Sequence, residues 1–191
     1  FELRASSYKN MKGTGGFLKP NKIIEELGIK EGMKIADFGC GAGYFTIFMA
    51  KTVGPKGKVY ALDVLKTALE SVRSKAKIEG LLNVETIWSN LERANGSKLE
   101  NESVDLVLLA NILFQSVKKA GIIREVKRIL KKNGRMIIIE WQKNQLVGPP
   151  ENLIVSKNLV QDLAEKEGFK LEKEFPAGDN HWGTIFINRS R

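Results

Sequence analysis

Three glycines at alternate positions, Gly39, Gly41 and Gly43, separate an apolar run that ends at Phe38 from another that begins at Tyr44. Glycine inside regular structure costs about 0.5–1 kcal/mol relative to alanine. Three of them so close together indicate a backbone that bends sharply or lets a ligand approach closely. The segment therefore predicts a tight turn between a strand and a helix, with a small molecule as the first candidate for its ligand.

From Met33 to Arg189 the sequence alternates short runs rich in β-branched and aromatic residues with longer runs of helical period. This alternation is typical of an α/β protein whose helices pack against a parallel sheet. The middle strands are almost continuously apolar, as strands covered on both faces are. The expected strands are Met33–Phe38, Lys58–Asp63, Val84–Trp88, Val104–Ala110, Arg135–Trp141, Phe169–Phe175 and Gly183–Asn188.

The loop Pro176–Trp182 between the last two strands is too short for a parallel crossover, which needs about a dozen residues or more. These two strands are therefore expected to pair antiparallel. The predicted fold class is α/β: a seven-stranded sheet, mostly parallel, with a C-terminal antiparallel hairpin and helices on both faces.

The segments between the strands have the apolar periodicity of helices. Ser156 is expected to cap the last helix at its N-terminus, and Asn133-Gly134 is expected to end the helix before the fifth strand. The expected helices are Tyr44–Thr52, Lys66–Glu79, one within the basic stretch Lys118 to Arg135, and Lys157–Glu167.

A length of 191 residues suits a single domain covering residues 1–191. Residues 1–16 end in the glycine-rich stretch Lys12–Gly16 and are expected to form a flexible or lid-forming N-terminal segment. The chain opens on Phe1 rather than on Met, so the sequence leaves open what precedes it. It predicts no oligomeric state.

Cys40 is the only cysteine, which excludes an internal disulfide bond and any metal site built from several thiolates. We therefore expect a cytoplasmic protein without a metal. The longest apolar run, Val104 to Phe114, is interrupted by Asp105 and Asn111. It is shorter than the roughly 18–20 residues of a membrane-spanning helix, so no transmembrane segment is expected.

The net charge of +9, from 31 Lys and Arg against 22 Asp and Glu, could attract nucleic acid, an anionic membrane surface or an acidic substrate. The basic residues are mostly lysines scattered along the chain. Their pattern favours a solvated surface, and no RNA-binding motif accompanies it.

The glycine spacing is G-x-G-x-G, and Tyr44 stands where a dinucleotide fingerprint has its third glycine. This departure disfavours a nicotinamide-dependent oxidoreductase. Asp63 ends the second strand 20 residues after Gly43, a separation at which a carboxylate can accept hydrogen bonds from ribose hydroxyls. The loop and the acid together predict a ligand that contains a ribose.

From about residue 17 to residue 189 the chain resembles the class I S-adenosylmethionine-dependent methyltransferases. The segment DFGCGAGYFT is similar to the first motif of that family, and VYALDV is similar to the second. The segment REVKRILKKNGRMIIIEW resembles the group that includes ubiquinone and menaquinone biosynthesis enzymes. The resemblance implies a Rossmann-like fold, methyl transfer, and S-adenosylmethionine as the cofactor.

In that family the glycine loop packs under the methionine and ribose portions of the cofactor, and the acid after the second strand holds the ribose. A polar residue after the third strand reaches the adenine, an acid before the loop orients the methionine amino end, and residues after the fourth strand line the methyl. The resemblance thus implies a site of Asp37, Gly39, the Cys40 backbone, Gly41, Gly43, Asp63, Val64, Ser89, Asn90, Ala110 and Asn111. Asn90 departs from the aspartate that is frequent in the family.

Methyl transfer from a sulfonium is an in-line displacement in which the enzyme chiefly aligns the acceptor, and no metal is required. An acceptor that loses a proton also needs a base near the carboxyl ends of the strands. Glu140 and His181 are candidates by position. Alternatively, His181 bridges backbone groups and Glu140 faces solvent or a helix dipole. Trp141 and Trp182 either wall the acceptor site or belong to the core.

The acceptor is expected to be a small molecule that the sequence does not identify. Asn111 is followed by Ile112-Leu113-Phe114 rather than by two prolines and an aromatic residue, which argues against methylation of the adenine amino group. A single thiol in the glycine loop argues against cytosine C5 and arsenite methylation. The alternatives are a methyltransferase acting on RNA or protein, and a non-catalytic S-adenosylmethionine-binding module.

Overall fold

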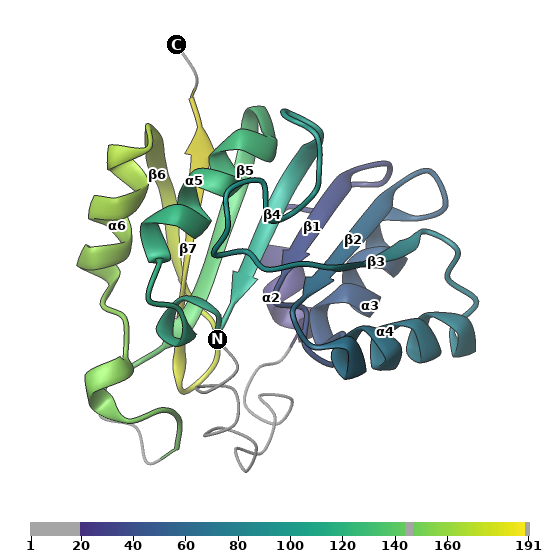
Figure 1. The fold of residues 1–191 in the computed structure, drawn as a ribbon, viewed down its shortest axis with the longest axis horizontal. Helices are drawn as coiled ribbons and strands as arrows, with labels where there is room; N and C mark the ends of the chain where they lie inside the picture. The colour runs from purple at the N-terminus through teal and green to yellow at the C-terminus, as the bar shows by residue number, and fades with distance from the viewer. Residues whose placement is uncertain (1–19, 144–146, 190–191) are drawn as a thin grey trace.

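Seven strands form one sheet in the order β3-β2-β1-β4-β5-β7-β6 (Figure 1). The computed structural model describes residues 20–143 and 147–189. The strands are β1 Lys34–Phe38, β2 Lys58–Asp63, β3 Val84–Trp88, β4 Val104–Ala110, β5 Leu130–Trp141, β6 Phe169–Pro176 and β7 His181–Asn188. Strands β1 to β5 pair in parallel, whereas β7 pairs antiparallel with both β5 and β6. The mixed sheet and its C-terminal antiparallel hairpin confirm the predicted fold class.

Helices cover both faces of the sheet (Figure 1). The helices are α2 Pro20–Glu26, α3 Tyr44–Val53, α4 Lys66–Ile78, α5 Lys119–Ile129 and α6 Lys157–Lys166, with 3-10 turns η2 Leu113–Gln115 and η3 Glu151–Leu153. The buried side chains of α5 and α6 pack on one face, and those of α2, α3 and α4 pack on the other. The sequence analysis identified each of these helices except α2.

Local signals account for several helix boundaries. The Ser156 side chain accepts a hydrogen bond from the Leu159 amide at 3.2 Å, which confirms the predicted N-cap of α6. After α4 the chain turns at Gly80, whose φ is 65°. The Leu81 amide there donates to the Ala76 carbonyl at 2.8 Å, which closes the helix end.

The prediction that Asn133-Gly134 ends the preceding helix is wrong. Helix α5 ends at Ile129, and β5 begins at Leu130 rather than at Arg135. Val104 pairs with Leu130 and Leu106 pairs with Arg135, so extra residues of β5 bulge out of the ladder. Asn133 lies in this bulge with a φ of 62°. Asn133-Gly134 therefore marks a strand irregularity rather than a helix end. An asparagine in the left-handed conformation suits either position.

The last loop is shorter than predicted, because β7 begins at His181 rather than at Gly183. The Gln142 amide donates to the Asn180 carbonyl at 2.8 Å, which extends the β5–β7 pairing beyond the predicted end. His181 and Trp182 therefore lie in a strand. This places both side chains inside the molecule, where the sequence analysis expected a loop.

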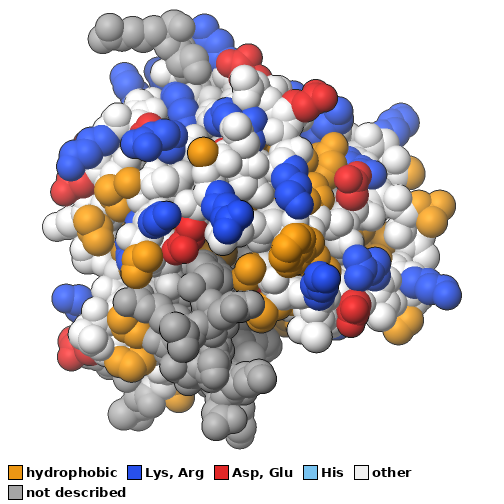
Figure 2. Space-filling model, in the orientation of Figure 1, with side chains coloured by type: hydrophobic (Ala, Val, Ile, Leu, Met, Phe, Trp, Pro, Cys, Tyr) orange, Lys and Arg blue, Asp and Glu red, His pale blue; other side chains and the backbone are white. Residues whose placement is uncertain are grey.

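Basic side chains are distributed over the visible face of the molecule, with acidic side chains among them (Figure 2). Among the described residues, Lys157 forms an ion pair with the exposed Glu174, and Arg124 forms one with the half-buried Glu167. In the described part of the chain, no helix is long and apolar enough to cross a membrane. The expected N-terminal segment, residues 1–16, lies outside the described residues, and the cytoplasmic location stays a prediction.

Candidate active site

The glycine loop connects β1 to α3 at the carboxyl ends of the parallel strands. The amides of Gly39 and Cys40 both donate to the Leu62 carbonyl of β2, at 2.8 and 3.0 Å. These bonds hold the loop against the neighbouring strand. Within the loop, the Gly43 amide donates to the Cys40 carbonyl at 2.9 Å, which closes a tight turn. In open α/β sheets this edge is where ligands bind.

Two of the glycines are required for different reasons. Gly39 has a φ of 72°, and a Cβ on it would lie 2.3 Å from Cδ1 of Ile112, so close packing excludes a side chain. Gly41 has a φ of 51°, yet a Cβ on it would meet no atom within 4 Å. Packing inside the protein therefore does not explain the glycine at 41. The open space above its backbone suits a ligand that lies on the loop.

Asp63, at the end of β2, binds the glycine loop through its carboxylate. Its Oδ2 accepts from the Gly41 amide and its Oδ1 accepts from the Leu65 amide, both at 2.9 Å. Burial raises the pKa of Asp63, and the hydrogen bonds from Leu65, Gly41 and Val64 oppose that rise. Each carboxylate oxygen retains acceptor capacity, so the group can also bind hydroxyls.

Asp37 lies on β1 directly before the loop and is 2% exposed. Its Oδ2 accepts a 2.6 Å hydrogen bond from the hydroxyl of Thr46 on α3. Burial raises the pKa of Asp37 to about 7; the Thr46 hydrogen bond opposes this rise, and the charge of Asp63 adds to it. A nearby cation would stabilise the ionised form. The sequence analysis missed Thr46, although it is the one buried hydroxyl in the apolar segment of α3.

The residues after β3 meet the turn that follows β2. The Ser89 amide donates to the Asp63 carbonyl at 3.0 Å, and the buried Ser89 hydroxyl has no hydrogen-bond partner. Asn90 is half-buried, and its side-chain oxygen accepts from the Glu92 amide at 3.0 Å. Val64 is also half-buried. The structure thus brings Val64, Ser89 and Asn90 to the same edge of the sheet as Asp63.

Asn111 follows β4 with a φ of 56°, and its amide donates to the Ile139 carbonyl of β5 at 2.8 Å. Its side-chain Nδ2 lies 3.1 Å from Nε2 of His181, while its buried Oδ1 has no partner. Ala110, the preceding residue, is half-buried. Because Ile112 packs against Gly39, the segment after β4 lies directly against the glycine loop.

Glu140 is fully buried near the end of β5 and does not face solvent. Its Oε1 accepts from the amides of Leu113 and Phe114 at 2.7 and 3.4 Å, so it caps the turn η2. Burial raises the pKa of Glu140 to about 8, against the opposing effect of these hydrogen bonds and of the Lys119 charge. The other oxygen, Oε2, is buried without a partner. Of the two alternatives for Glu140, contact with the end of a helix is close to the observed geometry, because the carboxylate binds the amides of the turn η2.

His181 is fully buried at the start of β7. Its ring lies 4.1 Å from the ring of Trp141, centroid to centroid. Burial lowers the pKa of His181 to about 4, so its imidazole is neutral at neutral pH. Its backbone carbonyl accepts from the Gln142 side chain at 3.0 Å, whereas Nδ1 has no partner.

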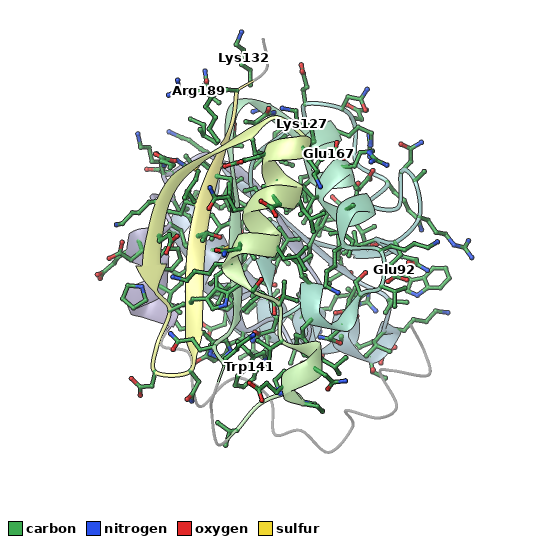
Figure 3. The ribbon with its side chains drawn as sticks, turned by 90° about the vertical axis from the view of Figure 1, so that its left-hand side faces the viewer. Glu92, Lys127, Lys132, Trp141, Glu167 and Arg189 are labelled. Carbon is green, nitrogen blue, oxygen red and sulfur yellow. The ribbon has the colours of Figure 1, made fainter. Side chains whose placement is uncertain are left out.

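Trp141 and Trp182 are 4% and 5% exposed and belong to the hydrophobic core on the α5 and α6 face. Figure 3 shows Trp141 at the end of the sheet opposite Lys132 and Arg189. Both tryptophans thus combine a core role with a place beside the candidate site, because Trp182 pairs with Glu140 and Trp141 pairs with His181.

Several buried polar atoms without a partner lie in β5 and β7 or just after β3 and β4. Unpartnered buried polar atoms are uncommon in folded proteins, and a group of them indicates a ligand or ordered water. Among the described residues they include Ser89 Oγ, Asn111 Oδ1, Glu140 Oε2, His181 Nδ1 and Thr184 Oγ1. Thr184 was not foreseen from the sequence. Together with the open space at Gly41, these atoms are suited to binding a polar ligand.

Comparisons with known proteins show which chains this one is similar to. The family described as "Methyltransferase domain" matches residues 29–186. A crystal structure of a SAM dependent methyltransferase from Aquifex aeolicus is similar with a TM-score of 0.84 and 28% identity, covering 96% of this chain and 97% of that one. In the described residues, no group of three or more His, Cys, Asp or Glu side chains could hold a metal ion.

Two curated relatives are similar in sequence over shorter stretches. Demethylmenaquinone methyltransferase of Lactococcus lactis subsp. lactis is 31% identical over 144 residues, which cover 73% of this chain and 56% of the relative. The ubiquinone/menaquinone biosynthesis C-methyltransferase UbiE of Shewanella sediminis is 31% identical over 64% of this chain and 48% of its own length. The chain therefore spans about half the length of these relatives.

Proposed function

This chain belongs to the methyltransferase-domain family and has S-adenosylmethionine as its cofactor, and we propose that it methylates a small molecule that carries an acidic hydroxyl. The observation that carries the proposal is that Asn111, Glu140 and His181, at the ends of β4 and β5 and the start of β7, each have a buried polar atom without a partner. The names of the relatives, which refer to quinone biosynthesis, support a hydroquinone as the acceptor.

We propose that the cofactor lies on the glycine loop. Asp63 would accept hydrogen bonds from the ribose, and Ser89 and Asn90 would contact the adenine beside Val64. Asp37, with one oxygen held by Thr46, would bind the methionine ammonium group. The remaining contacts would come from Gly39, the Cys40 backbone, Gly41, Gly43, Ala110 and Asn111.

The bound sulfonium supplies an already activated methyl group, so the task of the protein is to orient the acceptor and exclude water. The unpartnered atoms of Asn111 and His181 are suited to fixing an acceptor oxygen. Because the Asn111 side-chain amide and the His181 ring are both buried, bulk water does not compete with the acceptor for their hydrogen bonds. Two fixed contacts of this kind would align the reacting atom of the acceptor with the methyl group.

Removal of a proton from a hydroquinone requires a base, and the two candidates differ in pKa. Glu140, with a pKa of about 8, is the stronger base of the two, and its ionised form, which increases as the pH rises toward 8, can accept the proton. His181, with a pKa of about 4, is a weak base, and its Nε2 is engaged by Asn111. We therefore assign proton acceptance to Glu140 and orientation of the Asn111 amide to His181.

The test is methyl transfer from methyl-labelled S-adenosylmethionine to 1,4-dihydroxynaphthalene, followed by mass spectrometry of the product. 1,4-Dimethoxynaphthalene is the matched control, since it has the same rings but no acidic hydroxyl. We expect a methylated product from the diol alone, and a loss of roughly 100-fold or more in kcat for Glu140→Gln. Equal labelling of both compounds would contradict the role of the hydroxyl.

The same assay separates the alternatives. The net charge of +9 favours RNA as the second candidate acceptor, and such binding would weaken steeply as salt increases. Labelling of total RNA, without labelling of the diol, would replace the small-molecule proposal. Binding of the cofactor without transfer to any of these acceptors would favour a non-catalytic binding module.

A further inference from the structure

The turn from Asp63 to Leu65 joins β2 to α4 and carries the acid proposed to hold the ribose. Both oxygens of the Asp63 carboxylate are oriented by backbone amides, those of Gly41 and Leu65. The remaining lone pairs of the carboxylate therefore point in a direction that the backbone of this turn determines. A small shift of the turn would change the direction from which the Asp63 carboxylate can accept hydrogen bonds from a ligand.

Trp88 reaches this turn from the end of the neighbouring strand β3. Its indole Nε1 donates to the Val64 carbonyl at 2.9 Å. The next residue, Ser89, donates its backbone amide to the Asp63 carbonyl at 3.0 Å. Two consecutive residues of one strand end thus hold two consecutive carbonyls of the turn.

The Trp88 ring does not serve to fill the core, because the residue is 54% exposed. Two ammonium groups keep it in place instead: Nζ of Lys66 lies 5.5 Å from its ring and Nζ of Lys98 lies 5.3 Å from it. The Lys98 ammonium also donates to the Trp88 carbonyl at 2.7 Å. Because Trp88 is exposed and its N–H binds the turn that carries Asp63, the N–H rather than the burial of the ring accounts for a tryptophan at this position.

We propose that Trp88 is a positioning residue for the cofactor, whose indole N–H holds the turn Asp63–Leu65 in the shape that receives the ribose. The inference rests on the proposed function, since it takes Asp63 as the ribose ligand. Trp88 acts through the Val64 carbonyl and need not touch the cofactor itself.

The experiment compares wild type with Trp88→Phe, which keeps a ring for Lys66 and Lys98 but removes the N–H. Leu82→Ala is the control, because Leu82 is 96% exposed and precedes the other end of the same strand. Calorimetric titration with S-adenosylhomocysteine measures affinity without any reaction. Hydrogen exchange of the Leu65 amide in the ligand-free protein reports directly on the turn.

We expect Trp88→Phe to weaken binding about threefold to tenfold, the worth of one hydrogen bond, and to speed exchange at Leu65, while the melting temperature stays near that of wild type. Leu82→Ala should match wild type in both measurements. Affinity equal to wild type in Trp88→Phe would overturn the inference, and so would equal weakening in both variants. If wild type itself does not bind, the proposed function fails and the inference fails with it.

Discussion

The side-chain Nδ2 of Asn111 and the Nε2 of His181 lie 3.1 Å apart, although 70 residues separate them in the sequence. Because the His181 ring is buried and neutral, its Nε2 can accept the hydrogen bond that the amide donates. The pair joins the end of β4 to the start of β7 across the intervening strand β5. It thereby fixes the amide at the edge where the glycine loop lies.

This pair should show energetic coupling. His181→Phe leaves the Asn111 amide buried without a partner, which costs about 1–3 kcal/mol of stability. Asn111→Gly removes the side-chain amide, and glycine readily adopts the left-handed backbone conformation of residue 111. In a double-mutant cycle measured by urea unfolding, the two losses should add to more than the loss of the double variant, by roughly 1 kcal/mol. Strict additivity would contradict the hydrogen bond.

Substitutions at two glycines of the loop should affect stability and cofactor binding differently. Gly41→Ala places a Cβ in open space, so we expect a loss of roughly 1 kcal/mol of stability from the left-handed backbone, together with a large loss of cofactor affinity. Gly39→Ala drives a Cβ into Ile112 and should mainly lower the melting temperature. Thermal unfolding and calorimetry on both variants check this. Full affinity in Gly41→Ala would argue against a ligand on the loop.

Glu140 should make the protein less stable at higher pH. Its pKa is about 8 in the folded chain against 4.5 for an ordinary glutamate, so the folded state binds the extra proton between these values. Its contribution is fully present below about pH 4.5 and is lost as the pH rises through about 8.

Glu140→Gln removes that titration and keeps an oxygen for the Leu113 amide. The variant should therefore gain stability relative to wild type between pH 5.5 and pH 8, by on the order of 1 kcal/mol or more, since one pKa unit corresponds to about 1.4 kcal/mol. Urea unfolding at both pH values measures the difference. Parallel pH profiles for the two proteins would show that Glu140 titrates normally.

Cys40 should be chemically inert in the folded protein. Burial, and the charges of Asp37 and Asp63, raise the pKa of its thiol, and the residue is 8% exposed. Because the thiolate is the reactive form, we expect no measurable alkylation by iodoacetamide at pH 8 in the native protein, and full alkylation in urea. Mass spectrometry gives the readout. Rapid labelling of the native chain would mean that the loop opens.

The central strands were predictable because they are short, mainly apolar runs bounded by turn residues, and the short last loop required an antiparallel pair. The start of β5 was not, because Asn133-Gly134 suits the end of a helix and a strand bulge equally well, and only the pairing with β4 decides between them. The first residues of β7 were missed for a related reason. They pair with Trp141 and Glu140 of β5, which lie far away in the sequence.

At the candidate site, the glycine loop and Asp63 could be found from spacing alone. The environment of Glu140 could not, because the amides that it caps belong to η2, which precedes it by more than 20 residues and approaches only in the folded sheet. The partners of Asp37 and His181 likewise come from other elements. Sequence spacing locates a carboxylate or an imidazole, whereas its pKa depends on burial and on neighbours that the fold brings to it.

The central claim is that Asp63 and the glycine loop bind S-adenosylmethionine. The most direct measurement is calorimetric titration of wild type and Asp63→Ala with S-adenosylmethionine, using the exposed Asp162→Ala on α6 as the matched control. We predict micromolar binding by wild type and Asp162→Ala, and no measurable binding by folded Asp63→Ala. Undiminished binding by Asp63→Ala, or none by folded wild type, would contradict the account.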